Sequence, residues 1–352
     1  GHGEWSTARR ITIPLLRPAI AAGALLVALY TLSDFGAVAL LQYETFTWAV
    51  FLQYETAFNP TLAASLSLVL VGVAVALVAS EAAARRRAQY YTGANAARRD
   101  RRLTRLGRWR WPALGFSGGV ALLALGVPTY VLVFWLAQGV SHGEPLLFQW
   151  SAASASMRVS ALAAIAAVVA AIPVSILSVR RPGPLSGILE RLSYTGFALP
   201  GIAVALGLVF FGVNFAAPLY QTTPLLVFGY VVLFLPVAVG SIRSSLLQLN
   251  PRMEEAALTL GRSRLNAFLT ITLPLIWPGL AAGAVMVFLL TMKELPATLI
   301  LSPLGMDTLA TSIWSAVDQA FLARAAAPSL LLILVSAAPM TFLVLRERER
   351  QA

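Results

Sequence analysis

The stretch GRSRLNAFLTITLPLIWPGLAAGA, residues 261–284, repeats much of GHGEWSTARRITIPLLRPAIAAGA, residues 1–24. When the two are aligned at a separation of 260 residues, ten of the 24 positions are identical without a gap. A repeat at this separation predicts two related parts in one chain. Because the first copy begins at the position of Gly261, we expect the chain to be the C-terminal part of a longer protein. The alternative is an eight-span protein whose first copy has decayed.

The composition is that of a membrane protein. Hydrophobic residues make up 58% of the chain and charged residues 12%, whereas soluble domains contain about 45–50% and about 25%. Long stretches lack Asp, Glu, Lys and Arg, and about 20 apolar residues cross a bilayer as a helix. We therefore predict an all-α polytopic membrane protein with eight transmembrane helices. The predicted spans are residues 18–40, 61–84, 112–138, 155–179, 190–213, 224–246, 277–297 and 325–345.

The basic residues are distributed unevenly along the chain, which carries a net charge of +11. Of the 26 Lys and Arg residues, 23 lie in five segments that alternate with loops almost free of positive charge. This is the positive-inside pattern, and it predicts a cytoplasmic C-terminus. It also favours a lipid bilayer over nucleic acid as the partner of the basic segments. The five segments are residues 9–17, 85–110, 180–191, 243–264 and 346–350.

The loop before the second repeat copy has the signals of a helix–glycine–helix unit. Asn250 and Pro251 favour a helix start, and Glu255 then lies in the first turns, where the helix dipole favours negative charge. Gly261 predicts the C-terminal stop, and Ser263 is a cap for a second short helix. Pro274 and Pro278 are expected to end that second helix before the next span.

The spacing Glu-Ala-Ala, three residues, Gly, nine residues, Ile-x-Leu-Pro resembles the EAA loop of permease subunits of bacterial ATP-binding cassette importers. The resemblance covers essentially the whole chain and implies two fused permease halves. The residues carried over to the coupling loop, about 247–276, are Glu255, Ala256, Ala257, Gly261, Ile271, Leu273 and Pro274. Those of the partial first loop are Gly1, Ile11, Ile13 and Pro14.

The same resemblance implies the division of the chain. Residues 1–84 would be the end of a first half with two transmembrane helices, and residues 85–111 an Arg-rich cytoplasmic linker. Residues 112–346 would be a complete six-helix second half, and residues 347–352 a cytoplasmic tail. In this family the EAA loop docks on an ATPase. We therefore expect as partners two ATPase subunits and a periplasmic or extracellular substrate-binding protein, at the bacterial plasma (inner) membrane.

Groups for catalysis are scarce in this sequence. It has no cysteine, two isolated histidines and no G-x-x-x-x-G-K-[ST] loop. We expect no catalytic residue, no metal site and no cofactor in this chain, with ATP hydrolysed by a partner subunit. A membrane-embedded enzyme is disfavoured for the same reason. A secondary transporter driven by an ion gradient is the more remote alternative, because such folds also contain repeats.

Two acidic residues at equivalent positions of the repeat are candidates for the substrate pathway. Asp34 and Glu294 coincide under the 260-residue shift, and each ends an apolar span. Ionisable residues there often face a cavity or a partner, so one interpretation is a shared outer gate. The other is that both cap helices and that Lys293 pairs with a nearby acid.

The segments around these two acids point to a substrate. Residues 33–36, SDFG, and 293–298, KELPAT, resemble fused permeases for ferric iron. Permeases for thiamine, polyamines and phosphonates share much of the pattern, so they are the alternatives to iron.

Overall fold

The computed structural model describes residues 4–7, 9–10, 13–87, 107–143, 149–181 and 183–351. Within these ranges every regular element is a helix, which confirms the predicted all-α fold. Most of the predicted Arg-rich linker lies outside the described residues. The helices are α1 (Glu4–Thr7), α2 (Ile13–Ser33), α3 (Gly36–Leu40), α4 (Phe46–Glu55), α5 (Pro60–Arg87), η2 (Gly107–Trp109), α6 (Arg110–Ala121), η3 (Leu122–Gly126), α7 (Val127–Ser141), α8 (Trp150–Arg180), α9 (Pro184–Ala198), α10 (Gly201–Phe215), η4 (Ala217–Leu219), α11 (Thr223–Leu247), α12 (Arg252–Thr259), α13 (Arg264–Ala267), η5 (Phe268–Thr272), α14 (Leu273–Met292), α15 (Pro296–Leu301), α16 (Leu309–Asp318) and α17 (Leu322–Gln351).

Six helical segments of the described residues are long and apolar enough to cross a membrane. Each overlaps a predicted span, so the polytopic architecture is confirmed. The predicted count of eight is not. The apolar part of α2, Gly23–Ser33, is shorter than a span, and α9 and α10 form a bent pair that would make a seventh crossing. The six segments are Pro60–Ser80, Gly107–Ser141, Trp150–Arg180, Thr223–Leu247, Arg264–Met292 and Leu322–Thr341.

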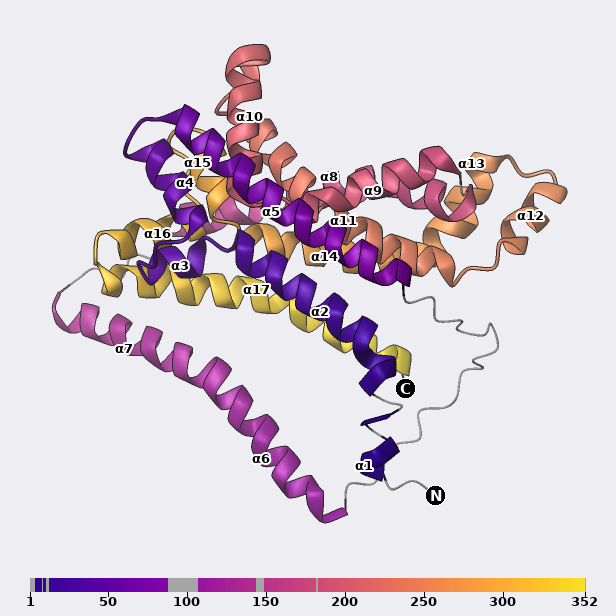
Figure 1. The fold of residues 1–352 in the computed structure, drawn as a ribbon, viewed down its shortest axis with the longest axis horizontal. Helices are drawn as coiled ribbons and strands as arrows, with labels where there is room; N and C mark the ends of the chain where they lie inside the picture. The colour runs from indigo at the N-terminus through magenta and orange to yellow at the C-terminus, as the bar shows by residue number, and fades with distance from the viewer. Residues whose placement is uncertain are drawn as a thin grey trace.

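The predicted span over residues 190–213 is not one continuous helix, because the chain bends between α9 and α10. The two helices meet at 106°, and Figure 1 shows α10 rising away from the rest of the bundle. Leu199 and Pro200 at the bend have extended backbone, with ψ of 130° and 135°. Proline disfavours the helical conformation of the residue before it and lacks a backbone N–H donor, so the helix ends there despite its apolar sequence.

The prolines within the second repeat copy, Pro274 and Pro278, do not end a helix, contrary to the prediction. A single helical segment runs from Arg264 to Met292 through Pro274 and Pro278. Within this segment a π-helical turn, Phe268–Thr272, comes directly before α14, which contains both prolines. Such local adjustments, together with neighbouring helices, let a transmembrane helix tolerate proline. The predicted span over residues 277–297 therefore begins and ends earlier than expected.

The centre of the bundle is formed by α8, α11 and α14, with α11 packed against both of the others. The buried residues are mainly small or branched aliphatic side chains: Ala164, Ala167, Ala171, Ala238, Val239, Ile242, Leu246, Ile276, Leu280 and Val287. The α11–α14 crossing is close, since a Cβ on Gly279 would lie 2.8 Å from the Ser241 carbonyl oxygen. Small residues at crossings permit this close packing in membranes.

The order of helices is the same after each copy of the sequence repeat. α2 begins within the first copy and is followed by α3, α4 and α5, and α14 begins within the second copy and is followed by α15, α16 and α17. α4 and α16 each have ten residues and a threonine cap. The Thr45 hydroxyl accepts from the Trp48 backbone N–H (3.4 Å) and the Thr308 hydroxyl from that of Thr311 (3.3 Å). The repeat therefore extends, as structure, well beyond the first 24 residues.

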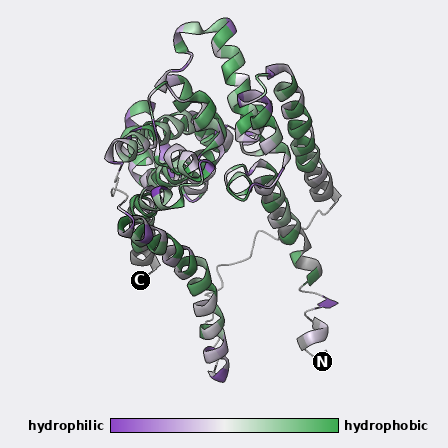
Figure 2. Cartoon of the chain, turned by 90° about the vertical axis from the view of Figure 1, so that its left-hand side faces the viewer, coloured by the Kyte–Doolittle hydropathy of each residue, from purple (hydrophilic) through white to green (hydrophobic). Residues whose placement is uncertain are grey.

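One long segment stands apart from the central bundle. η2, α6, η3 and α7 together form the 35-residue segment Gly107–Ser141, and only α7 packs along α17 (Figure 1). Hydrophobic residues predominate along this and the other long helices, as Figure 2 shows, and many of their large apolar side chains are exposed. Large exposed apolar surfaces on long helices are expected where lipid is the solvent.

Candidate functional site

The loop between α11 and α14 folds as the predicted helix–glycine–helix unit. The Asn250 side chain accepts a hydrogen bond from the Arg252 backbone N–H at the start of α12 (3.1 Å). Gly261 ends α12 with a φ of +84°, a conformation that side chains rarely adopt. The Ser263 hydroxyl then caps α13 by accepting from the Asn266 N–H (3.3 Å). Local capping rules therefore suffice to build this loop.

The predicted coupling residues fall into three groups by exposure. Glu255, Ala256, Gly261 and Pro274 are exposed, Ile271 and Leu273 are half-buried, and Ala257 is buried. Thus the carboxylate of Glu255 is free to meet a partner, whereas Ala257 packs toward the bundle. α12 and α13 lie together at one end of the molecule, far from α4, α15 and α16 at the other (Figure 1).

Apolar side chains are exposed around Glu255. Leu260 is 84% exposed, and four others near it are at least 39% exposed. The four are Met253, Leu258, Leu265 and Leu269. Beside them a hollow of about 550 Å³ is lined by Glu255, Leu258, Arg181 and Arg264, among others. An exposed apolar patch with a charged rim is typical of a protein-binding surface.

Glu254, which the sequence analysis did not single out as a site residue, has the most contacts of the loop's acids. Its Oε1 atom accepts from Arg180 Nη2 at 3.1 Å and from Thr272 Oγ1 at 2.6 Å. Arg180 ends α8 and Thr272 ends the π-helical turn η5. The adjacent acids of the motif therefore differ: Glu255 faces outward, and Glu254 ties α12 to the spans.

Of the partial first loop, the structure describes only a part. Gly1 and Ile11 lie outside the described residues. Ile13 is the first residue of α2 and is 49% exposed, and Pro14 follows it in the same helix. The role predicted for these four residues stays a prediction.

Asp34 and Glu294 line one and the same hollow, of about 180 Å³. Asp34 follows α2 and Glu294 follows α14. The hollow therefore lies where the first set of repeated helices, α2–α5, meets the second set, α14–α17. Gly201 at the start of α10 forms another wall, and a Cβ there would lie 2.6 Å from Glu294 Oε1. The structure therefore brings together two residues that are 260 positions apart in the sequence.

Both acids also stand at the start of a short helix. Asp34 Oδ1 accepts from the Ala37 N–H of α3 (3.5 Å), and Glu294 Oε1 from the Ala297 N–H of α15 (3.4 Å). Lys293 contacts Tyr30: its amine donates to the hydroxyl at 3.2 Å and lies 5.2 Å from the ring centre. Helix capping and a place in the hollow are thus compatible for the two acids.

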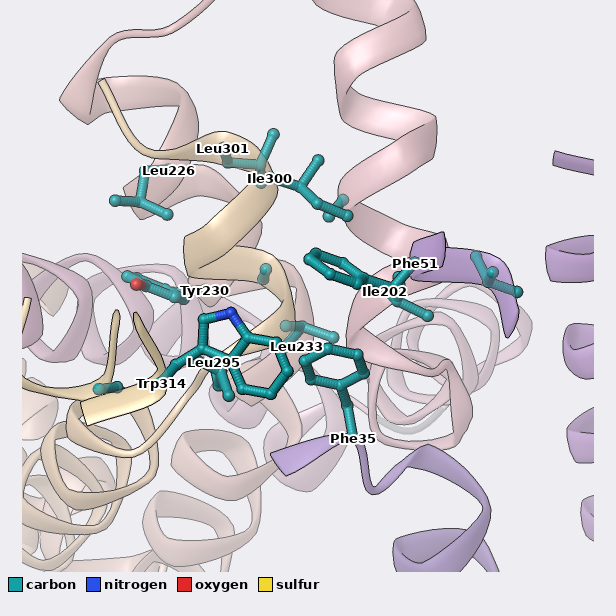
Figure 3. Close-up of a cluster of buried hydrophobic side chains, with 14 of the residues drawn as sticks. Phe35, Phe51, Ile202, Leu226, Tyr230, Leu233, Leu295, Ile300, Leu301 and Trp314 are labelled. Carbon is teal, nitrogen blue, oxygen red and sulfur yellow. The ribbon is translucent and has the colours of Figure 1, made fainter. Parts of the chain in front are cut away.

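An aromatic cluster closes the hollow on one side. Phe35, which lines the hollow, is 1% exposed and packs on Trp48, Phe51 and Trp314, with ring centroids 6.1, 5.1 and 5.4 Å away. In Figure 3, Phe35 and Phe51 from the first set of helices point toward Trp314 and Leu295 from the second. This arrangement could hold the two sets together on the side of α4 and α16.

Comparison with known families gives a match over the second part of the chain. The family described as "Binding-protein-dependent transport system inner membrane component" matches residues 163–348. The matched range begins within α8 and includes the whole α12–α13 loop and Glu294. It thus covers both candidate sites in part, and it ends in α17.

Comparison with curated proteins and solved structures gives relatives of differing extent. The chain is 38% identical over 333 residues to the Fe(3+)-transport system permease protein FbpB 2 of Haemophilus influenzae, covering 94% of this chain and 66% of that protein. It is 30% identical over 166 residues to the molybdenum transport system permease protein ModB of Escherichia coli, covering 43% of this chain and 71% of that protein. A bacterial alginate ABC transporter, solved with an alginate-bound periplasmic protein, has a chain with a TM-score of 0.53 at 16% identity, covering 68% of this chain and 94% of that one.

Proposed function

Because the chain belongs to the family of binding-protein-dependent transport system inner membrane components, we propose that it is a permease subunit of an ATP-binding cassette importer. Its multi-pass apolar helices fit the inner membrane location of the family. The observation that supports this proposal most directly is the α12–α13 loop, an exposed apolar surface around the outward-facing Glu255. In this proposal an ATPase subunit binds that surface, hydrolyses ATP and drives the permease, which has no ATPase site of its own.

The proposed partners follow from this role. Two ATPase subunits would bind, one at the α12–α13 loop and one at the related first loop, to which Ile13 and Pro14 would belong. A substrate-binding protein would deliver the substrate at the other end of the molecule, near α4, α15 and α16. The C-terminus would be cytoplasmic, because the basic segments near residues 180–191 and 243–264 are on the side of the ATPase-binding loop.

The proposed pathway runs through the hollow between the two sets of helices. Asp34 and Glu294 both face this space, so they would favour a cation during passage. Repeated halves that rock about a shared interface would open this region to one side of the membrane and then to the other. The site needs no fixed cage, since a permease must also release its substrate.

Ferric iron is the substrate that we propose. The relative named as a Fe(3+) permease matches nearly the whole chain, whereas the molybdenum and 2-aminoethylphosphonate permeases match 43% and 47% of it. Thiamine, polyamine, phosphonate or molybdate transport by the same machinery is the alternative.

Two measurements test these proposals separately. The full transporter, reconstituted in proteoliposomes with its ATPase subunit and binding protein, should take up labelled ferric ion in preference to molybdate and thiamine. Preference for another solute would overturn the substrate and leave the permease role standing. Failure of the detergent-solubilised permease to capture any ATPase subunit would overturn the permease role.

A further inference from the structure

A single carboxylate oxygen joins three helical segments at the loop end of the molecule. Glu254 Oε1, on α12, accepts from Arg180 Nη2 at the end of α8 and from Thr272 Oγ1 in the segment Arg264–Met292. The donors come from 74 residues before Glu254 and 18 residues after it. The meeting of these two donors at Glu254 Oε1 therefore depends on tertiary packing and not on local sequence.

The three side chains are largely withdrawn from water. The Arg180 side chain is 16% exposed and that of Glu254 30%, and Thr272 is 2% exposed. Hydrogen bonds to charged groups are stronger than neutral ones, and partial burial reduces their screening. We call these three hydrogen-bonded side chains, Glu254, Arg180 and Thr272, the joint. The joint is stiffer than an ion pair at a free surface, where two long side chains exchange partners easily.

The joint connects the proposed docking helix to the helices that form the core. α8 and α14 both pack on α11 through one buried aliphatic cluster, so a displacement of either is shared with the other. The segment that holds Thr272 continues unbroken to Met292, two residues before Glu294. At about 1.5 Å per residue, the part of this segment from Thr272 to Met292 carries a displacement over some 30 Å toward the hollow that Glu294 lines.

We propose that Glu254, Arg180 and Thr272 are the positioning residues that convert movement of the docked α12 into movement of α8 and α14. The two adjacent acids then have different roles. Glu255 contacts the ATPase subunit, and Glu254 transmits the movement of α12 to the transmembrane helices. This inference rests on the proposed permease role, because it needs a partner that moves α12.

The test measures coupling in the reconstituted full transporter. Arg180→Met and Thr272→Val alter the joint from the side of the spans and change no residue of α12, although both side chains also line the hollow beside Glu255. We expect the ATPase to be captured by both variants, while stimulation of ATP hydrolysis by the loaded binding protein falls about tenfold, the size of an ordinary coupling energy. Arg180→Lys keeps a cation and should restore most of the stimulation.

A double-mutant cycle with Glu254→Gln identifies the joint as one unit. Arg180→Met combined with Glu254→Gln should lose little more stimulation than either change alone, because both remove the same interaction. Glu190→Gln is the matched control, since Glu190 forms an ion pair with Arg243 (3.3 Å) that joins α9 to α11 and includes no residue of α12. This control should keep its stimulation.

Three results would overturn the inference. They are stimulation within about twofold of the unaltered protein in Arg180→Met, additive losses in the double variant, or an equal loss in Glu190→Gln. Each of these leaves ATPase capture intact, so none would touch the permease role. Absence of capture by the unaltered protein would refute the permease role instead.

Discussion

Trp314 and Phe51 meet edge to face, with ring centroids 5.9 Å apart and an angle of 85° between the rings. Trp314 lies on α16 and Phe51 on α4, each six residues after its threonine cap, Thr308 or Thr45. They are therefore equivalent residues of the repeat in contact with each other. Such a self-complementary contact is the mark of an axis of approximate twofold symmetry.

Trp314→Ala should destabilise the protein by about 3–5 kcal/mol, the usual cost of removing a buried large aromatic side chain. The reason is that Trp314, 8% exposed, contacts Phe35, Trp48 and Phe51 at once. The midpoint of thermal unfolding in detergent would measure it. Trp277→Ala is the control, since Trp277 is 55% exposed. Equal shifts for the two variants would show that the aromatic cluster does not hold the two sets of helices together.

Gly279→Ala should separate α11 from α14 and lower stability by about 1–3 kcal/mol, the cost of overpacking. The added Cβ would lie 2.8 Å from both the Ser241 carbonyl oxygen and Ser245 Cβ. Gly207→Ala on α10 is the control, because nothing lies within 4 Å of a Cβ there. Thermal unfolding midpoints of the two variants compare them directly. A neutral Gly279→Ala would mean that the crossing relaxes freely.

Glu255→Arg should weaken binding of the ATPase subunit at least about tenfold, because it reverses the charge on an exposed face. Capture of the ATPase by the solubilised permease, titrated with the ATPase subunit, measures this affinity. Glu44→Arg, an equivalent change at the other end of the molecule, should leave capture as it was. Retention of full affinity by Glu255→Arg would exclude this carboxylate from the docking surface.

Asp34→Asn combined with Glu294→Gln should reduce ferric ion uptake several-fold while ATPase capture persists. Both changes keep the shape and a hydrogen-bonding oxygen for the helix starts at Ala37 and Ala297, and remove only the charge. Uptake into proteoliposomes is the measurement. Glu190→Gln removes a charge outside the hollow, away from the proposed binding-protein side, and serves as the control. Unchanged uptake in the double variant would mean that these carboxylates only cap α3 and α15.

The sequence predicts those features that depend on neighbouring residues. The turns of the α12–α13 loop are local effects, set by the side-chain caps of Asn250 and Ser263 and by the positive φ of Gly261. The helix break at Pro200 is also a local effect, but the apolar length of the segment outweighed it in the prediction. The opposite error at Pro278 has a tertiary cause, because packing against α11 and a π-helical turn sustain the helix.

The contacts that define the candidate sites are not local. The equivalence of Asp34 and Glu294 was visible as a repeat, but their meeting in one hollow depends on how two sets of helices pack. The motif spacing selects Glu255 and gives no role to Glu254, since the partner of Glu254, Arg180, lies 74 residues away in the sequence. The sequence pattern therefore identifies the loop, and only the structure shows that Glu254 and Glu255 have different surroundings.

The segment Gly107–Ser141, of which α7 packs along α17 and α6 does not, has a consequence for the lipid environment. None of the residues in its most apolar stretch is buried inside the protein. The side chains of this stretch therefore have no fixed volume to fill, and substitutions there that alter size should be tolerated where those that introduce charge are not. About 20 residues suffice to cross the hydrocarbon layer, and this segment has 35. Charged substitutions should therefore be tolerated near both of its ends, and the two positions where tolerance begins would mark the thickness of the membrane around the protein.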